Sequence, residues 1–133
     1  MELRDLYPEK WFVVFCDSPR LRWWQRFLKP GFRHVEIFGW DHRSRRWIVV
    51  SPAMDMLLIM TMDDGEFGLY RAELAKRGAR ILMTQAAEAG PWRPRLILSC
   101  VSVVSQVLGL PGPGAVRPIA LYRMLLQRGA TEV

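Results

Sequence analysis

Cys100 is the residue whose type and setting in this sequence most favour covalent chemistry. It follows Ser99, a residue type that caps helix N-termini, and Val104 and Leu108 recur after it at helical spacing. The partial positive charge at a helix N-terminus favours the thiolate form of a cysteine, which is the nucleophile. We therefore predict a helix over residues 100–109 with Cys100 at its first position, on the face that packs on the core.

A cysteine nucleophile needs a base, and His34 is the candidate that this sequence supplies. His34 lies in an alternating stretch, residues 32–40, and an apolar run at residues 45–51 follows a polar turn, which together predict a β-hairpin. In that hairpin His34 and Glu36 share one face, and Glu36 lies opposite a residue close to Ser51. His34 is either a general base or a histidine whose ring nitrogens are satisfied by neighbours. Glu36 either orients the ring, pairs with a nearby arginine or is solvated.

The rest of the chain predicts short strands and helices around this pair. Apolar runs bounded by turn residues are typical of strands, and apolar residues three or four positions apart are typical of helices. We expect strands at residues 11–16, 56–62 and 80–84 and helices at residues 20–28, 66–77 and 118–129. Residues 130–133 are expected to fray. This order predicts one α+β domain over residues 1–133, with a mainly antiparallel sheet and the cysteine helix packed on it.

Composition and charge restrict the functional classes. Half of the residues are hydrophobic, no run approaches the roughly 20 apolar residues of a membrane span, and the first residues lack a signal-peptide pattern. We therefore expect a folded protein of the cytoplasm, with Cys16 and Cys100 as free thiols and a disulfide between them as the alternative. The net charge of +6 divides into +4 over residues 1–46, −2 over 47–92 and +4 over 93–133, so the basic ends leave contact with nucleic acid open.

Three other kinds of chemistry match this sequence poorly. Its two cysteines and two histidines include no closely spaced ligand pair, so we expect no metal site and no cofactor. The Gly-x-Ser-x-Gly turn of many serine hydrolases does not occur in the sequence, and the acidic residues cluster in turns and helix caps rather than as a catalytic pair. Cysteine chemistry is what remains.

A histidine on a hairpin strand, followed much later by a cysteine that begins a helix, is the layout of a known superfamily. The chain resembles small phage and prophage proteins of the circularly permuted papain-like superfamily, which includes NlpC-type amidases and lecithin:retinol acyltransferase-like proteins. The similar segments, which fall in the same order within residues 11–129, are FRHV (32–35), WIVVSP (47–52), SCVSVV (99–104), LGL (108–110) and PIALY (118–122).

This resemblance implies a permuted papain-like fold and a cysteine hydrolase or acyltransferase acting on an amide or thioester, with peptidoglycan as one candidate substrate. It implies Cys100 as the nucleophile, His34 as the general base, and the Cys100 amide among the groups that bind the oxyanion. The third, orienting position falls on Ser51, where the superfamily often has an acidic residue before the proline. Glu36 is the alternative orienting residue.

A second hypothesis comes from a different functional class. A serine hydroxyl stabilises an imidazolium much less than a carboxylate does, so Ser51 is also consistent with an inactive site. The protein would then be a virion or accessory structural protein with the same fold, whose basic ends contact nucleic acid or other phage proteins. Both hypotheses place it in the bacterial cytoplasm or in a phage particle.

Overall fold

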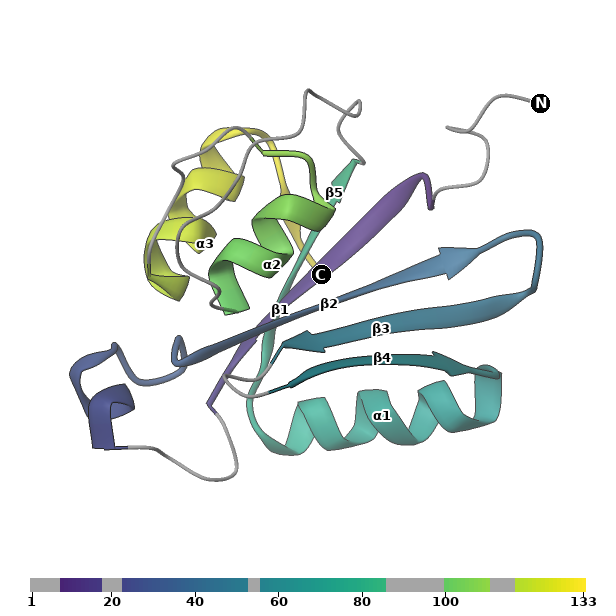
Figure 1. Ribbon diagram of the computed structural model, residues 1–133, viewed down its shortest axis with the longest axis horizontal. Coiled ribbons are helices and arrows are strands. Elements are labelled where there is room, and N and C mark those ends of the chain that lie inside the picture. Colours follow the sequence, from purple (N-terminus) through teal and green to yellow (C-terminus); the bar gives the residue numbers. More distant parts are fainter. Residues whose placement is uncertain (1–7, 18–22, 53–55, 86–99, 111–116) are drawn as a thin grey trace.

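A six-stranded antiparallel sheet forms the centre of the protein, in a computed structural model that describes residues 8–17, 23–52, 56–85, 100–110 and 117–133 (Figure 1). The strand order is β4-β3-β2-β1-β5-β6, and every pairing is antiparallel. The strands are β1 (Lys10–Cys16), β2 (His34–Asp41), β3 (Arg46–Pro52), β4 (Leu57–Met62), β5 (Arg80–Gln85) and β6 (Thr131–Glu132). The sequence-based prediction of an α+β domain with a mainly antiparallel sheet is therefore confirmed.

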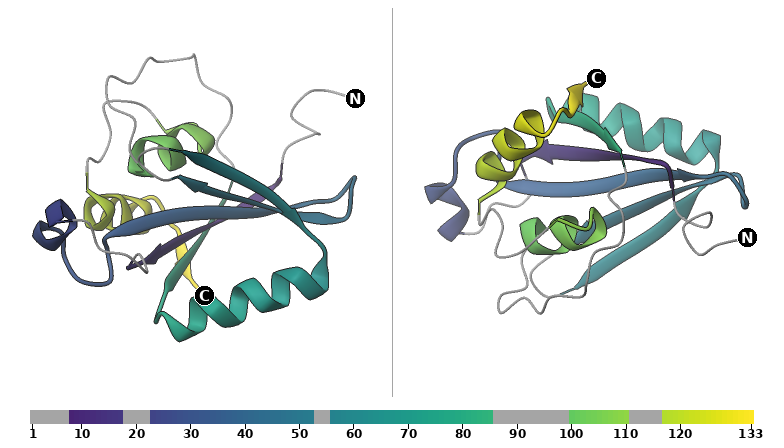
Figure 2. Two further views of the ribbon diagram at one scale, coloured as in Figure 1. Left: turned by 60° about the horizontal axis from the view of Figure 1, so that its bottom comes forward. Right: turned by 90° about the horizontal axis from the view of Figure 1, so that it is seen from above.

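Three α-helices within the described part of the chain pack on the two faces of this sheet (Figures 1 and 2). Helix α1 (Asp64–Lys76) lies on one face, while α2 (Cys100–Val107) and α3 (Pro118–Gln127) lie on the other. Because α1 joins β4 at the sheet edge to β5 on the far side of β1, it crosses the face that it covers. No helix among the described residues is long and apolar enough to cross a membrane.

Each face of the sheet has its own apolar core, because successive side chains of a strand point to opposite sides. In β1, Val13 and Phe15 contribute to the core beneath α2 and α3, whereas Val14 and Cys16 contribute to the core beneath α1. The α1 core is rich in aromatic rings, and Phe38 of β2 packs edge-on against Phe67 of α1 at a centroid distance of 5.1 Å. The two cores hold the hairpin β2-β3 between α1 and α2.

Helix α1 begins and ends where its sequence provides the signals. Asp63 is the N-cap and accepts a hydrogen bond of 2.8 Å from the Glu66 amide, and the Glu66 side chain returns to the Asp63 backbone in a capping box. Gly78 follows the helix with φ +64°, a left-handed conformation that glycine adopts without a steric penalty. The helix predicted over residues 66–77 is thus present, and it begins two residues earlier.

Two expectations from the sequence need correction. The C-terminal tail does not fray, because Thr131 and Glu132 form β6 on β5 and the Val133 amide donates to the Ile81 carbonyl at 3.0 Å. The exposed edge of β5 offers backbone groups for this pairing, which an isolated tail sequence does not reveal. In place of a helix over residues 20–28, the structure has a short 3-10 helix, Trp23–Phe27, and residues 18–22 lie outside the described ranges.

Candidate active site

His34 and Cys100, separated by about half of the chain, lie at the starts of β2 and α2. His34 is the first residue of β2, and Cys100 is the first residue of α2, which packs against β2 and β3. The Cys100 side chain is close enough to the imidazole to be among the groups that raise the pKa of His34. Cys100 is half-buried against the apolar core beneath α2 and is the first described residue of that helix, while Ser99 lies outside the described residues.

The carboxylate that contacts the imidazole belongs to Glu36. Nε2 of His34 lies 3.2 Å from Oε1 of Glu36, and the two residues share a face of β2 because they are two positions apart. With Nε2 engaged by the carboxylate, Nδ1 is the ring nitrogen that remains for Cys100. One side of the ring is therefore held by a carboxylate.

Glu36 is held in turn by two hydroxyl groups. The Ser51 hydroxyl donates to Oε1 at 2.9 Å, and the Tyr70 hydroxyl donates to Oε2 at 2.6 Å. Glu36 is only 7% exposed, so these hydrogen bonds and the histidine replace the water that a buried carboxylate loses. Ser51 thus contacts the carboxylate instead of the ring, and its hydroxyl acts on His34 through Glu36.

The alternatives left open for Glu36 are resolved by this geometry. Its burial excludes a solvated side chain, and the nearby arginines have other partners. Arg33 lies 3.5 Å from Asp17, and Arg46 lies 3.7 Å from a carboxylate oxygen of α1. Neither of these arginines forms an ion pair with Glu36, whose carboxylate contacts His34 instead.

The hydrogen bonds of the site favour a positive imidazole and a negative carboxylate. Burial is the largest single influence on His34 and opposes its charge, but hydrogen bonds to Cys100 and Glu36, with their charges, outweigh it and raise the pKa of His34 to about 9. Burial likewise opposes the charge of Glu36, and the hydrogen bonds from His34, Tyr70 and Ser51 outweigh it, so the pKa of Glu36 is lowered. The pair is ionised at neutral pH.

The chemistry that this arrangement supports is nucleophilic attack by a thiolate. A thiolate paired with an imidazolium is the nucleophilic form of a cysteine, and the imidazolium can later return a proton to a leaving group. The Cys100 amide belongs to the first turn of α2, where N–H groups have no partner within the helix and can bind a developing oxyanion. Among the residues described, no group of three or more histidine, cysteine or carboxylate side chains is arranged to hold a metal ion.

Family models, curated proteins and solved structures were each compared with this chain, and none of them matches it.

Sequence reasoning missed the contribution of Tyr70. Tyr70 lies within the helix predicted over residues 66–77, and its ring packs against Phe67 at a centroid distance of 5.9 Å. Its hydroxyl, however, forms the shortest hydrogen bond to Glu36. The tyrosine hydroxyl could have indicated this contact, because a tyrosine on an otherwise apolar helix face needs a hydrogen-bond partner once it is buried.

Proposed function

We propose that this protein is a cysteine hydrolase or acyltransferase with a permuted papain-like fold, in which Cys100 is the nucleophile, His34 the general base and Glu36 the orienting carboxylate. Two observations carry the proposal: Nε2 of His34 lies 3.2 Å from the Glu36 carboxylate, and the Cys100 side chain is among the groups that raise the pKa of His34. A carboxylate such as that of Glu36 stabilises an imidazolium, and a thiol such as that of Cys100 exchanges a proton with it.

In the proposed reaction the Cys100 thiolate attacks the carbonyl carbon of an amide, ester or thioester. A C–S bond forms, the carbonyl electrons move to oxygen, and the amides at the start of α2 bind that oxyanion. The bond to the leaving group breaks as His34 donates its proton to the departing nitrogen, oxygen or sulfur. Water, or another acceptor, then gives a proton to His34 and attacks the thioester, which releases the acyl product and regenerates Cys100.

Glu36 supplies the carboxylate that the position of Ser51 lacks. In the observed register Ile37 faces Val50, so the next pair along the hairpin is Glu36 and Ser51. A serine at this position is therefore compatible with an active site: it donates to a carboxylate on the adjacent strand instead of orienting the ring directly. This geometry favours the enzyme hypothesis over a site lost through the serine.

The proposal is tested by acylation with an activated ester, 4-nitrophenyl acetate, at neutral pH. We expect one acetyl group on Cys100, detected by intact mass and peptide mapping, followed by slow deacylation. His34→Gln should slow acylation by about a hundredfold, in line with the loss of a general base. The matched control is His42→Gln, which removes an exposed histidine from the β2-β3 turn.

Acylation at the same rate in His34→Gln as in the unchanged protein would contradict the proposed enzyme. So would acetylation confined to lysines, with Cys100 unmodified. Either result would favour the structural hypothesis, because an inactive member of the fold needs a cysteine at this position only for packing.

A further inference from the structure

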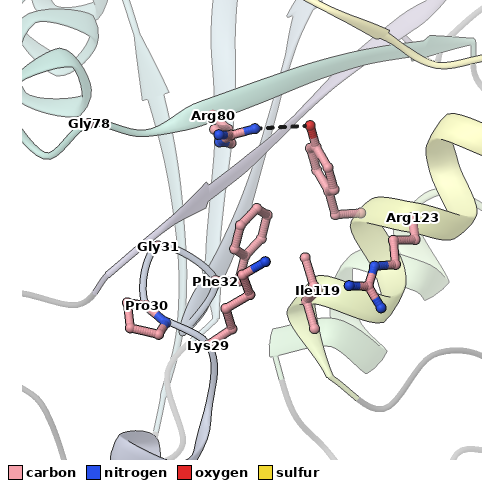
Figure 3. Close-up of a pocket in the computed structure, with 9 residues that line it drawn as sticks. Lys29, Pro30, Gly31, Phe32, Gly78, Arg80, Ile119 and Arg123 are labelled. Carbon is pink, nitrogen blue, oxygen red and sulfur yellow. Dashed lines mark hydrogen bonds between the residues drawn. The ribbon is translucent and has the colours of Figure 1, made fainter.

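A cavity of about 340 Å³ lies apart from Cys100 and His34, between the β1-β2 connection, the start of β5 and the first turns of α3 (Figure 3). Its size is at the lower end of the range for small-molecule sites. Besides glycine and proline, its lining consists of Lys29, Phe32, Arg80, Ile119, Tyr122 and Arg123. Neither Cys100 nor His34 lines it, so it is not the catalytic centre proposed above.

Three cations from three separate segments border this cavity. Lys29 belongs to the β1-β2 connection, Arg80 begins β5, and Arg123 lies in α3 (Figure 3). Arg80 has a nearby carboxylate, Glu132 of β6, at 3.8 Å. Among the residues that the structure describes, no carboxylate forms an ion pair with Lys29 or Arg123, so the cavity has an excess of positive charge. Such a site attracts an anion.

The cavity also has an apolar wall with a fixed geometry. The rings of Phe32 and Tyr122 meet edge to face at a centroid distance of 5.0 Å, and both residues are buried. The Phe32 ring is flanked by two cations, with Lys29 Nζ and Arg80 Cζ each 5.8 Å from its centroid. The Arg80 guanidinium is also positioned by a hydrogen bond of 3.4 Å to the Tyr122 hydroxyl (Figure 3). Charge and apolar surface are thus adjacent, which suits a ligand that has both.

We propose that this cavity binds a small phosphate monoester, with the phosphate held by Lys29 and Arg123 and its organic group against Phe32 and Ile119. A phosphate monoester is a dianion near neutral pH and offers three oxygens, which matches two cations without carboxylate partners in the described part of the chain better than a single carboxylate does. The Arg123 guanidinium can bind two such oxygens at once, whereas Arg80 already contacts Glu132 and Tyr122. Inorganic phosphate alone leaves the apolar wall unused.

The test is calorimetric titration of the full chain with phenyl phosphate at low salt, with inorganic phosphate and phenol as the two halves of the probe. We expect phenyl phosphate to bind at least about fivefold more tightly than either half. Lys29→Gln and Arg123→Gln should each weaken it about tenfold, as the loss of a charged hydrogen bond does. Both side chains are exposed, so both variants are expected to fold.

Arg71→Gln is the matched control, because Arg71 is an exposed arginine on α1 that does not line the cavity. It should leave binding unchanged, and so should Cys100→Ala, which separates this site from the proposed reaction. Phenol binding as tightly as phenyl phosphate would overturn the proposal. The proposal would also be overturned if inorganic phosphate bound as tightly as phenyl phosphate, or if Arg123→Gln left the affinity for phenyl phosphate unchanged. Absence of phenyl phosphate binding at millimolar concentrations would overturn it as well.

Discussion

Cys16 and Cys100 are both free thiols, yet the protein places them in opposite environments. Cys16 ends β1, is 1% exposed in the aromatic core beneath α1, and pairs across the sheet with His34. Burial, followed by the negative charge of Glu36, raises the pKa of Cys16 to about 12. Cys100 is half-buried, is the first described residue of α2 and is among the groups that raise the pKa of His34.

The difference between these cysteines shows what the site requires beyond a thiol near a histidine. Both thiols lie near the His34–Glu36 pair, but Cys16 is subject to the repulsion of the carboxylate, whereas Cys100 stabilises the positive imidazole. A thiolate next to a buried carboxylate is disfavoured, and a thiolate next to an imidazolium is favoured. The two thiols therefore differ in their position relative to one ionised pair: Cys16 is affected by the carboxylate and Cys100 by the imidazole.

The contrast predicts highly selective alkylation in the folded protein. Iodoacetamide at pH 7 should modify Cys100 on the order of a thousandfold faster than Cys16, because Cys16 combines burial with a negligible thiolate fraction. Peptide mapping over a time course measures both rates in one sample. After denaturation the two alkylation rates should converge. Comparable rates in the native protein would contradict the proposed difference between the environments of Cys16 and Cys100.

Removing the carboxylate should destabilise the protein strongly. Glu36→Gln leaves the His34 imidazolium buried without its counter-charge, which costs about 4 kcal/mol of unfolding free energy. Urea denaturation at pH 7 measures the loss. Glu9→Gln, at an exposed carboxylate ahead of β1, is the matched control and should change stability little. Equal losses in the two variants would mean that the pair contributes nothing.

The raised pKa of His34 predicts a pH-dependent stability. Because the folded-state pKa of about 9 exceeds the ordinary value of 6.5, the contribution is complete below pH 6.5 and is lost as pH rises towards 9. Relative to His34→Gln, the unchanged protein should lose about 3 kcal/mol across that interval. Urea denaturation at several pH values measures the difference. A difference that stayed constant with pH would show that the imidazole is not held in its charged form.

Tyr70→Phe should have a smaller effect. It removes only the hydroxyl that donates to Glu36 at 2.6 Å, and hydrogen bonds to charged groups contribute about 2 kcal/mol. Tyr122→Phe is the matched control, since its hydroxyl makes longer contacts of 3.4 Å with Arg80 and Glu132. Thermal or urea unfolding of both variants tests whether α1 supports the site: a larger loss for Tyr122→Phe would mean that it does not.

Much of the fold followed from local sequence patterns. The hairpin prediction put Glu36 opposite a residue close to Ser51, and these side chains are hydrogen-bonded, because turn position and strand alternation together set the register. The two-residue strand β6 was not predictable, because its residues have no strand pattern of their own and pair only where β5 offers an edge.

The sequence was enough to name Cys100 and His34 as candidate site residues, but not to predict which side chains contact them. Cys100 and His34 were identified from a helix start and a strand histidine, and the structure brings them together. The sequence did not decide whether Glu36 or Ser51 contacts the His34 ring, because both side chains lie on the same face of the sheet. Their distances to the ring differ by only a few ångströms, which strand alternation does not predict. Tyr70 lies 34 positions from Glu36 along the chain, so its contact depends on how α1 packs across the sheet.

The most direct test of the proposed pair is the alkylation rate of Cys100 in the unchanged protein and in His34→Gln, both folded, at pH 7. If the imidazole activates the thiol, removing it should slow the reaction about tenfold or more. Cys16→Ala in both proteins confines the signal to the one cysteine. Equal rates with and without His34 would contradict the assignment of Cys100 and His34 as a catalytic pair.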